Sequence, residues 1–445
     1  MKVTIKNLPF LIVDLFAFYL ALFLALTIRL GANFNLEIYN FHFRKFTWPL
    51  LFFLVILYVL GLYDLRNLSR LFKYFRLLTT GAAVFFVFST LYFYFFPIAN
   101  ISPKTILVLF TLILGGVDFT LREFLRRYLI KSQPLSSALM IAKGDDAEEL
   151  NRYIGENPQL GYKITNWIKE YDIHAIDEAL AQNKNNIIII PSQMRSDRFF
   201  SKKIYEKLLK GTDVIGFSEF YENTLGKVSM DELKENWFLE KIKPRDGLYP
   251  LVKRMIDIFL AFLVLVITWP LWLVIALLIK ISSKGPALYL KERVSLQENK
   301  FILYKFRTMH EGGEEIHKLR EDFSTERGDA KRVFGFGKFL RRARLDELPQ
   351  VINVLKGELS FVGPRADFVD YYNILKEKIP YYQIRTIILP GLSGWGQIHD
   401  KFGNSKDSAI ERLAYDIFYI KNRSLMLDVA ISLKTLKTLL TLSGT

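Results

Sequence analysis

The chain has 445 residues, of which 51% are hydrophobic and 15% aromatic, and its formal net charge is +15. This length exceeds one ordinary domain, and the composition is richer in apolar residues than that of most soluble enzymes, which indicates membrane segments. The sequence contains no cysteine, which excludes disulfides, thiolate metal sites and cysteine nucleophiles. The excess of Lys and Arg has three candidate partners, namely nucleic acid, anionic lipid headgroups and phosphorylated substrates.

The first part of the chain contains four apolar runs, at residues 9–30, 47–63, 77–96 and 105–121. Each is close to the ~20 residues that a membrane-spanning helix needs. Basic residues precede the first run, separate the second from the third and follow the fourth, so both ends of this block are expected to be cytoplasmic. Asp14 and Asp118 lie near those ends, and we expect each to pair with a nearby Lys or Arg. Residues 1–125 are therefore predicted to form four transmembrane helices that serve as an anchor or dimerisation block.

The middle of the chain has an α/β pattern. Its short apolar runs at 137–142 and 186–192 are suited to buried parallel strands, and 146–156 and 197–209 are suited to helices. This predicts a Rossmann-like cytoplasmic domain over residues 126–240. The sequence after the first predicted strand, AKGDD (142–146), lacks the three glycines of a dinucleotide site and places two acids where a pyrophosphate would lie. We therefore predict a degenerate domain and disfavour an NAD-dependent sugar enzyme.

A fifth apolar run, at residues 258–281, is interrupted by Pro270. Lys253 and Arg254 precede the run and further lysines follow it, so both of its ends have the positive charge that is typical of cytoplasmic segments. Proline breaks the helical hydrogen-bond ladder, which predicts a sharp kink. We predict a re-entrant helix over 250–281 that enters the inner leaflet and returns, with a simple span as the alternative. Asp257 at its mouth is expected to pair with Arg254 or a later arginine.

A pair of acids, Asp346 and Glu347, stands in the basic segment 340–365. Apolar residues at helical spacing predict a helix that begins near Asp346, has Pro349 in its first turn and ends at Gly357. Two carboxylates at a helix N-terminus, close to arginines, suit anionic oxygens together with a divalent metal. The alternative is that the acids merely cap the helix.

Five motifs in the last part of the chain then identify a resemblance. They are YKFRTM (304–309), LDELPQ (345–350), LKGELSFVGPR (355–365), PGLSGWGQ (390–397) and RLAYDIFYIKNRSLMLD (412–428). Together they resemble the bacterial sugar transferase family, the monotopic polyprenyl-phosphate phosphoglycosyl transferases, from residue 249 to the C-terminus. The four runs and the middle domain resemble the long form of this family, similar to the undecaprenyl-phosphate hexose-1-phosphate transferases. The expected fold class is membrane α plus α/β, with an α/β catalytic domain at 241–445.

The resemblance implies transfer of a sugar-1-phosphate from a UDP-sugar to undecaprenyl phosphate, which gives a polyprenyl diphosphosugar and UMP. It implies a multi-pass protein of the bacterial inner (cytoplasmic) membrane, with the catalytic domain on the cytoplasmic face and no nucleic-acid partner. This reaction would be the first membrane step of exopolysaccharide, capsule or O-antigen synthesis. A homodimer is expected from the membrane block. The alternative from another class is a non-catalytic membrane scaffold for polysaccharide export.

The resemblance also implies residue roles. Asp346 is expected to be the nucleophile of a ping-pong reaction through a phosphosugar-aspartyl intermediate, and Glu347 is expected to bind Mg²⁺. The residues expected to bind the phosphates are Lys305, Arg307, Arg342 and Arg365. The residues expected to contact the base or sugar are Gln350, Asn353 and Gln397. The residues assigned to the re-entrant helix are Lys253, Arg254, Asp257 and Pro270.

Overall fold

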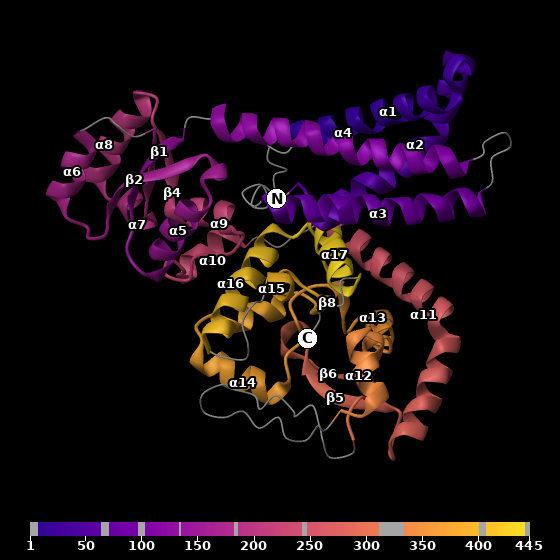
Figure 1. The fold of residues 1–445 in the computed structure, drawn as a ribbon. Helices are drawn as coiled ribbons and strands as arrows, with labels where there is room; N and C mark the ends of the chain where they lie inside the picture. Colours follow the sequence, from indigo (N-terminus) through magenta and orange to yellow (C-terminus); the bar gives the residue numbers. More distant parts are fainter. Residues whose placement is uncertain are drawn as a thin grey trace. The chain divides into compact units, whose positions relative to one another are not determined.

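The computed structural model describes residues 8–63, 71–96, 103–132, 135–181, 186–242, 247–310, 333–399 and 406–440. The basic residues before residue 8 and between 64 and 70, which entered the predicted orientation, lie outside this set. The chain divides into two compact units, Met1–Phe217 and Ser218–Thr445 (Figure 1). The predicted domain limit at residue 240 thus lies inside the second unit. The division into three domains remains a prediction from the sequence.

The first unit begins with long apolar helices, which are α1 (Leu8–Leu30), α2 (Leu36–Leu60), α3 (Leu71–Phe95) and α4 (Pro103–Ser132). A 3₁₀ turn at Gly31–Asn33 joins the first two. The predicted apolar runs are thus confirmed as helices. Their core is aromatic, with Phe18 edge-on to both Phe85 and Phe110. Among the described residues, these four and α11 are long and apolar enough to cross a bilayer.

A buried ionic cluster ties the membrane helices together. Arg122 on α4 donates from Nε to Asp14 Oδ1 at 2.6 Å, and its Nε lies 3.3 Å from Asp118 Oδ2. Its Nη1 also donates to the Tyr74 hydroxyl on α3, at 3.0 Å. All of these side chains are buried, where an unpaired charge would be costly. The prediction that Asp14 and Asp118 pair with a basic residue is confirmed.

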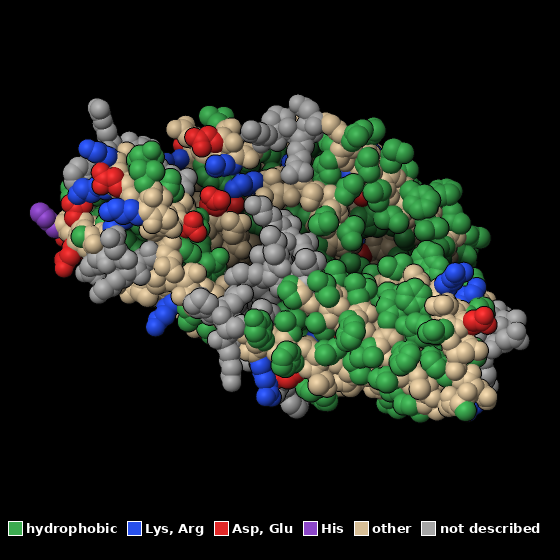
Figure 2. Space-filling view, turned by 90° about the horizontal axis from the view of Figure 1, so that it is seen from above, with side chains coloured by type: hydrophobic (Ala, Val, Ile, Leu, Met, Phe, Trp, Pro, Cys, Tyr) green, Lys and Arg blue, Asp and Glu red, His purple; other side chains and the backbone are tan. Residues whose placement is uncertain are grey.

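The rest of the first unit is an α/β fold. Its parallel strands are β1 (Ser136–Ile141), β2 (Tyr162–Ile168), β3 (Ile187–Ile190) and β4 (Asp213–Gly216), in the order β2-β1-β3-β4. Its helices are α5 (Asp145–Glu156), α6 (Ile173–Ala181), α7 (Ser192–Ser196) and α8 (Arg198–Leu209), with a 3₁₀ turn at Pro158–Leu160. The predicted parallel α/β pattern is confirmed. In Figure 2, charged side chains gather at the side where α6 and α8 lie, and hydrophobic ones at the side of α1–α4.

The second unit is built around two small sheets. Strands β5 (Leu288–Val294) and β6 (Lys300–Phe306) form an antiparallel hairpin, joined by a 3₁₀ turn at Leu296–Glu298. Strands β7 (Ser360–Val362) and β8 (Gly391–Ser393) are parallel. The helices are α9 (Phe217–Leu225), α10 (Glu235–Lys241), α11 (Leu248–Ser282), α12 (Gly335–Arg342), α13 (Gln350–Lys356), α14 (Val369–Lys378), α15 (Trp395–His399), α16 (Lys406–Asn422) and α17 (Leu425–Leu440). Two further 3₁₀ turns are η6 (Leu345–Glu347) and η7 (Tyr382–Ile387).

Helix α11 is one helix of 35 residues with Pro270 inside it. Figure 1 shows it changing direction part-way along its length, as a proline inside a helix leads us to expect. Lys253 forms an ion pair with Asp428 at 2.9 Å. Arg254 donates to the carbonyls of Val354 and Leu355, at 2.6 and 2.9 Å.

Asp257 differs from its prediction. It is buried, and its Oδ1 accepts a hydrogen bond from the backbone N–H of Phe361 at 3.2 Å. The guanidinium of Arg254 instead donates to the carbonyls at the end of α13. These carbonyls attract a cation because they form the negative end of the helix dipole.

One side of α11 packs on the second unit along most of its length. Ala261 is in a core cluster with Phe301 and Leu303 of β6, and Ile275 and Ile279 are in another with Phe306. The remaining side is apolar and exposed, as at Phe259, Phe262, Ile267, Trp269, Leu273 and Leu277. Both halves of the helix are therefore attached to the same folded body.

Candidate active site

The two acids lie in the 3₁₀ turn η6, immediately before α13. The expected single helix from Asp346 is therefore wrong in detail. Leu348 N–H bonds to Leu345 O at 3.3 Å and Val351 N–H to Leu348 O at 3.2 Å, which is the tighter 3₁₀ pattern. Pro349 donates no N–H, and Arg344 before the turn has a left-handed φ of 55°. Gly357 ends α13 at φ 84°, as predicted.

Asp346 is the buried member of the pair, with 2% of its surface exposed. Its Oδ2 lies 2.7 Å from Nζ of Lys305, which β6 brings to the turn. Its Oδ1 is buried and has no hydrogen-bond partner. Burial raises the pKa of Asp346 above its usual value, and the nearby Lys305 ammonium opposes this rise without cancelling it. In the described part of the chain, no side chain caps η6 or α13 through a hydrogen bond, so Asp346 is not acting as a helix cap.

Glu347 stands in a more cationic setting. Its Oε1 lies 3.8 Å from Lys305 Nζ and 3.5 Å from Arg344 Nη1. Burial works to raise the pKa of Glu347, but the charges of Lys305, Arg365 and Arg344 together lower it below its usual value. The turn therefore presents one desolvated carboxylate and one carboxylate that its neighbours keep ionised.

Two of the four predicted phosphate-binding residues, Lys305 and Arg365, act electrostatically on this pair. Arg307 is placed differently, because it is buried and its guanidinium donates to the carbonyls of Ser283 (2.8 Å) and Lys284. It thus ties the end of α11 to the end of β6. Arg342 is exposed at the end of α12.

The three predicted base or sugar contacts also fall in different settings. Asn353 is buried, and its amide bonds to the backbone at Ile302 and Tyr304 and to the Glu358 carboxylate. The structure thus uses Asn353 to fix α13 to β6. Gln350 is buried at the start of α13. Gln397 on α15 has a buried Oε1 without a hydrogen-bond partner.

The loops after β7 and β8 lie in direct backbone contact. Gly363 N–H donates to Ser393 O, and Gly391 N–H donates to Pro364 O, both at 2.8 Å. A Cβ at Gly391 would lie 2.0 Å from the Gly363 nitrogen, so glycine is required by the close approach. These contacts fix Arg365 and the start of α15 relative to each other.

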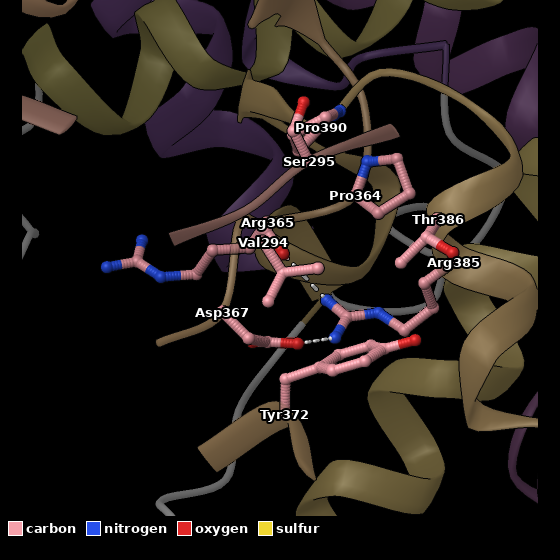
Figure 3. Close-up of a pocket in the computed structure, with 9 residues that line it drawn as sticks. All are labelled: Val294, Ser295, Pro364, Arg365, Asp367, Tyr372, Arg385, Thr386 and Pro390. Atoms are coloured by element: carbon pink, nitrogen blue, oxygen red, sulfur yellow. Dashed lines mark hydrogen bonds and ion pairs between the residues drawn. The ribbon is translucent and has the colours of Figure 1, made fainter. Parts of the chain in front are cut away.

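A buried network that sequence reasoning did not single out holds the Arg365 loop from behind. Arg385 pairs with Asp367 and, at 2.9 Å, with Asp416 Oδ2, and it donates to Arg365 O at 3.0 Å. Figure 3 shows the Arg365 side chain directed away from this network. Arg293 donates to Ala366 O at 3.0 Å. Two buried arginines thus hold the carbonyls of this turn.

The small cavity beside that network is not the substrate site. Its volume is about 10 Å³, enough for about one water, and it is lined by Val294, Ser295, Pro364, Arg365, Asp367, Tyr372, Arg385, Thr386 and Pro390 (Figure 3). Neither acid of the η6 turn is among these residues. The signal that could have found the network was in the motif at 412–428, which contains Asp416.

Within the described ranges, no group of three or more His, Asp or Glu side chains is placed to hold a metal ion. Mg²⁺ does not need such a group, since it is often held by one or two carboxylates together with substrate phosphates and water. Asp346, whose buried Oδ1 has no hydrogen-bond partner, and the neighbouring Glu347 are compatible with that donor set.

Comparison with known proteins supports the same assignment. The profile of the family described as "Bacterial sugar transferase" matches residues 248–442. A UDP-glucose:undecaprenyl-phosphate glucose-1-phosphate transferase of Caulobacter vibrioides is 39% identical over 193 residues, which are 42% of this chain and 70% of that protein. The chain belongs to the bacterial sugar transferase family.

Two further relatives show how far the likeness of this sugar transferase extends. One is the UDP-N-acetylgalactosamine-undecaprenyl-phosphate N-acetylgalactosaminephosphotransferase of Aeromonas hydrophila, 39% identical over 228 residues. That match spans 51% of this chain and about half, 52%, of the relative. The other is a UDP-glucose:undecaprenyl-phosphate glucose-1-phosphate transferase of Xanthomonas campestris, 27% identical over 345 residues, or 71% of this chain and 69% of that protein. The likeness to the latter therefore extends well beyond the residues matched by the family profile.

Proposed function

We propose that this sugar transferase transfers a sugar-1-phosphate from a UDP-sugar to undecaprenyl phosphate and releases UMP. The relatives named above act on these classes of donor and acceptor, which supports the assignment. The single observation that supports the mechanism best is Asp346, whose carboxylate is buried, paired through Oδ2 and unpartnered at Oδ1. A desolvated oxygen with a free lone pair is suited to attack on phosphorus.

In the first proposed step, Asp346 Oδ1 attacks the phosphorus that bears the sugar. A bond forms between this oxygen and phosphorus, and the bond to the oxygen bridging the two phosphates breaks, so UMP leaves with the bridging oxygen and its negative charge. Lys305 at 2.7 Å orients the attacking carboxylate through Oδ2. In this proposal, Lys305 and the exposed Arg365 offset the negative charge of the diphosphate, which their positive charges near Glu347 support.

In the second step, an oxygen of the lipid phosphate attacks the same phosphorus. The bond to Asp346 breaks, and the free carboxylate is restored together with the polyprenyl diphosphosugar. Dividing the transfer in this way means that two bulky anions never need to occupy the site together. No water or net proton is consumed.

Glu347 is the residue that we propose to hold Mg²⁺, with Asp346 beside it. When bound, the ion would neutralise the diphosphate and so reduce its repulsion of an anionic nucleophile. Glu347 suits this role because its neighbours lower its pKa, which keeps it ionised.

We further propose that α11 enters the inner leaflet and returns. The observation in favour is that both halves of the helix are attached to the second unit, through Arg254 and Ala261 in one half and Ile279 in the other. A helix that crossed the bilayer would carry its two ends to opposite sides. The exposed apolar side chains of α11 would then lie among lipid chains.

Covalent labelling tests the proposed chemistry. Full-length protein in detergent is incubated with a UDP-sugar labelled on the phosphate next to the sugar, and protein-bound label is counted before and after undecaprenyl phosphate is added. We expect label that disappears on adding the lipid, and none in Asp346→Asn. Asp370→Asn, which removes an exposed carboxylate of α14, is the matched control and should label normally. Undiminished labelling of Asp346→Asn would place the nucleophile elsewhere.

Substrate and topology are tested separately. UMP release from a panel of UDP-sugars identifies the donor, and a scaffold without catalytic activity would release none. A cysteine introduced at the exposed position Lys291, which follows α11, should react with membrane-impermeant maleimide only when the cytoplasmic side is opened. Reaction from the periplasmic side would refute the re-entrant arrangement.

A further inference from the structure

The segment of residues 218–242, here called the strap, lies N-terminal to the family match at 248–442 and yet belongs to the second unit. We propose that the strap positions α15, and with it Gln397, for binding of the UDP-sugar. This inference rests on the proposed function. It assigns positioning roles to Gly226 and Trp395, neither of which needs to touch the substrate.

The strap is part of the hydrophobic core of the second unit. Its residues Val228, Leu233 and Trp237 are buried in one cluster with Leu375 and Leu413 of α14 and α16. The backbone N–H of Val228 donates to Ala414 O at 3.1 Å. Because these side chains are at most 9% exposed, the strap is held by the burial of apolar surface and not by surface contacts alone.

Charged side chains fix the strap at both ends of α16. Glu222 of α9 accepts from Lys421 Nζ at 2.6 Å, and Lys227 donates to Glu411 at 3.3 Å. Burial raises the pKa of Glu222, while Lys421 opposes the rise. At the other end of the strap, the Tyr381 hydroxyl donates to Glu235 at 3.0 Å.

A hydrogen bond connects the strap to α15, the helix that carries Gln397. The indole N–H of Trp395, the first residue of α15, donates to Gly226 O at 2.7 Å. Gly226 has a left-handed φ of 73°, and a Cβ there would lie 3.4 Å from Trp395 Cζ2. Glycine therefore allows both the backbone conformation and the close approach of the indole ring.

Trp395 and Gln397 lie on the same short helix, so the contact at Trp395 also constrains Gln397. Gln397 follows Trp395 by two residues on α15, and its Oε1 is the buried acceptor that lacks a partner. Trp395 is 6% exposed, and its ring also packs on Phe418. Fixing the indole at Gly226 therefore fixes the direction from which Gln397 meets a ligand.

The test compares two conservative variants of the full-length protein. Trp395→Phe keeps an aromatic ring but removes the N–H donor. Since a lost hydrogen bond is worth about 0.5 to 1.5 kcal/mol, KM for the UDP-sugar should rise by about 2- to 10-fold, while the maximal extent of labelling of Asp346 is unchanged. Gly226→Ala, which strains the same contact from the other side, should show the same split between KM and labelling.

Tyr381→Phe is the matched control. It removes a hydrogen bond to Glu235, which lies nine residues along the strap from Gly226, the residue that Trp395 contacts. It should lower the melting temperature slightly and leave KM unchanged. If Trp395→Phe and Gly226→Ala lower only the melting temperature, or if Tyr381→Phe raises KM equally, the positioning role is refuted and the strap is purely structural. A wild-type protein that released no UMP would instead refute the proposed function.

Discussion

Removing Arg385 should destabilise the second unit more than almost any other single change. Its guanidinium is 4% exposed, and it neutralises Asp367 and Asp416, whose side chains are 6% and 2% exposed. Arg385→Met would remove the hydrogen-bonded countercharge of two buried carboxylates, so that Asp416 keeps only the charge of Arg412 nearby and Asp367 only that of Arg293. Breaking a buried pair in this way costs about 3–5 kcal/mol, and the lost hydrogen bond to Arg365 O adds about 1 kcal/mol.

The assay is urea unfolding of the protein in detergent, followed by the fluorescence of the buried Trp395 and Trp237. The reasoning also predicts a rescue. If the cost comes from stranded charge, then Arg385→Met combined with Asp367→Asn and Asp416→Asn should recover a large part of the loss. A single variant that changes the free energy of unfolding by less than about 1 kcal/mol, or a triple variant no more stable than the single one, would refute this account.

Four further outcomes are expected. Because burial raises the pKa of Asp346 above the ordinary value of 3.8, labelling should fall with acidification at a higher pH than for an ordinary aspartate; a fall in labelling only at or below that value would contradict the assignment. A raised pKa favours folding only while the group is protonated, and this contribution is lost as pH rises, so Asp346→Asn should melt at or above the wild-type temperature at pH 7 and lose any such advantage below the ordinary pKa. Asn353→Ala removes three hydrogen bonds and should cost about 3 kcal/mol in urea unfolding, whereas a loss below about 1 kcal/mol would show that they contribute little. Gly391→Ala should cost at least about 2 kcal/mol and abolish UMP release, while Gly155→Ala, which meets nothing within 4 Å, should be neutral or stabilising.

The large elements were predictable because burial leaves strong patterns in the sequence. The strand Ile187–Ile190 buries every side chain, and α1–α4 each contain a long apolar window, of which only 28–39% is buried within the protein; continuous hydrophobicity identifies both kinds of segment. Strand β2 was not predicted, since its residues alternate only weakly between intermediate and exposed positions. Its parallel pairing to β1 is a tertiary effect that its own residues do not signal.

At the site, the sequence identified the two acids but did not show that they differ in burial and in hydrogen-bond partners. Local pattern placed Asp346 and Glu347 in one helix, but the 3₁₀ turn depends on Pro349 and the left-handed Arg344 together. Arg307, within the YKFRTM motif, and Asn353, just after LDELPQ, are polar residues that turn inward to satisfy backbone groups, and such a role depends on distant parts of the chain. Sequence spacing alone gives no information about those partners.

The membership of the strap in the hydrophobic core has a practical meaning for anyone who dissects this enzyme. A truncated version that starts at residue 248, where the match to the family profile begins, would lack Val228, Leu233 and Trp237. The truncated protein would then expose an apolar surface of α14 and α16 to water, and it would be prone to aggregation. Cutting upstream of α9 instead leaves that surface covered by its own chain.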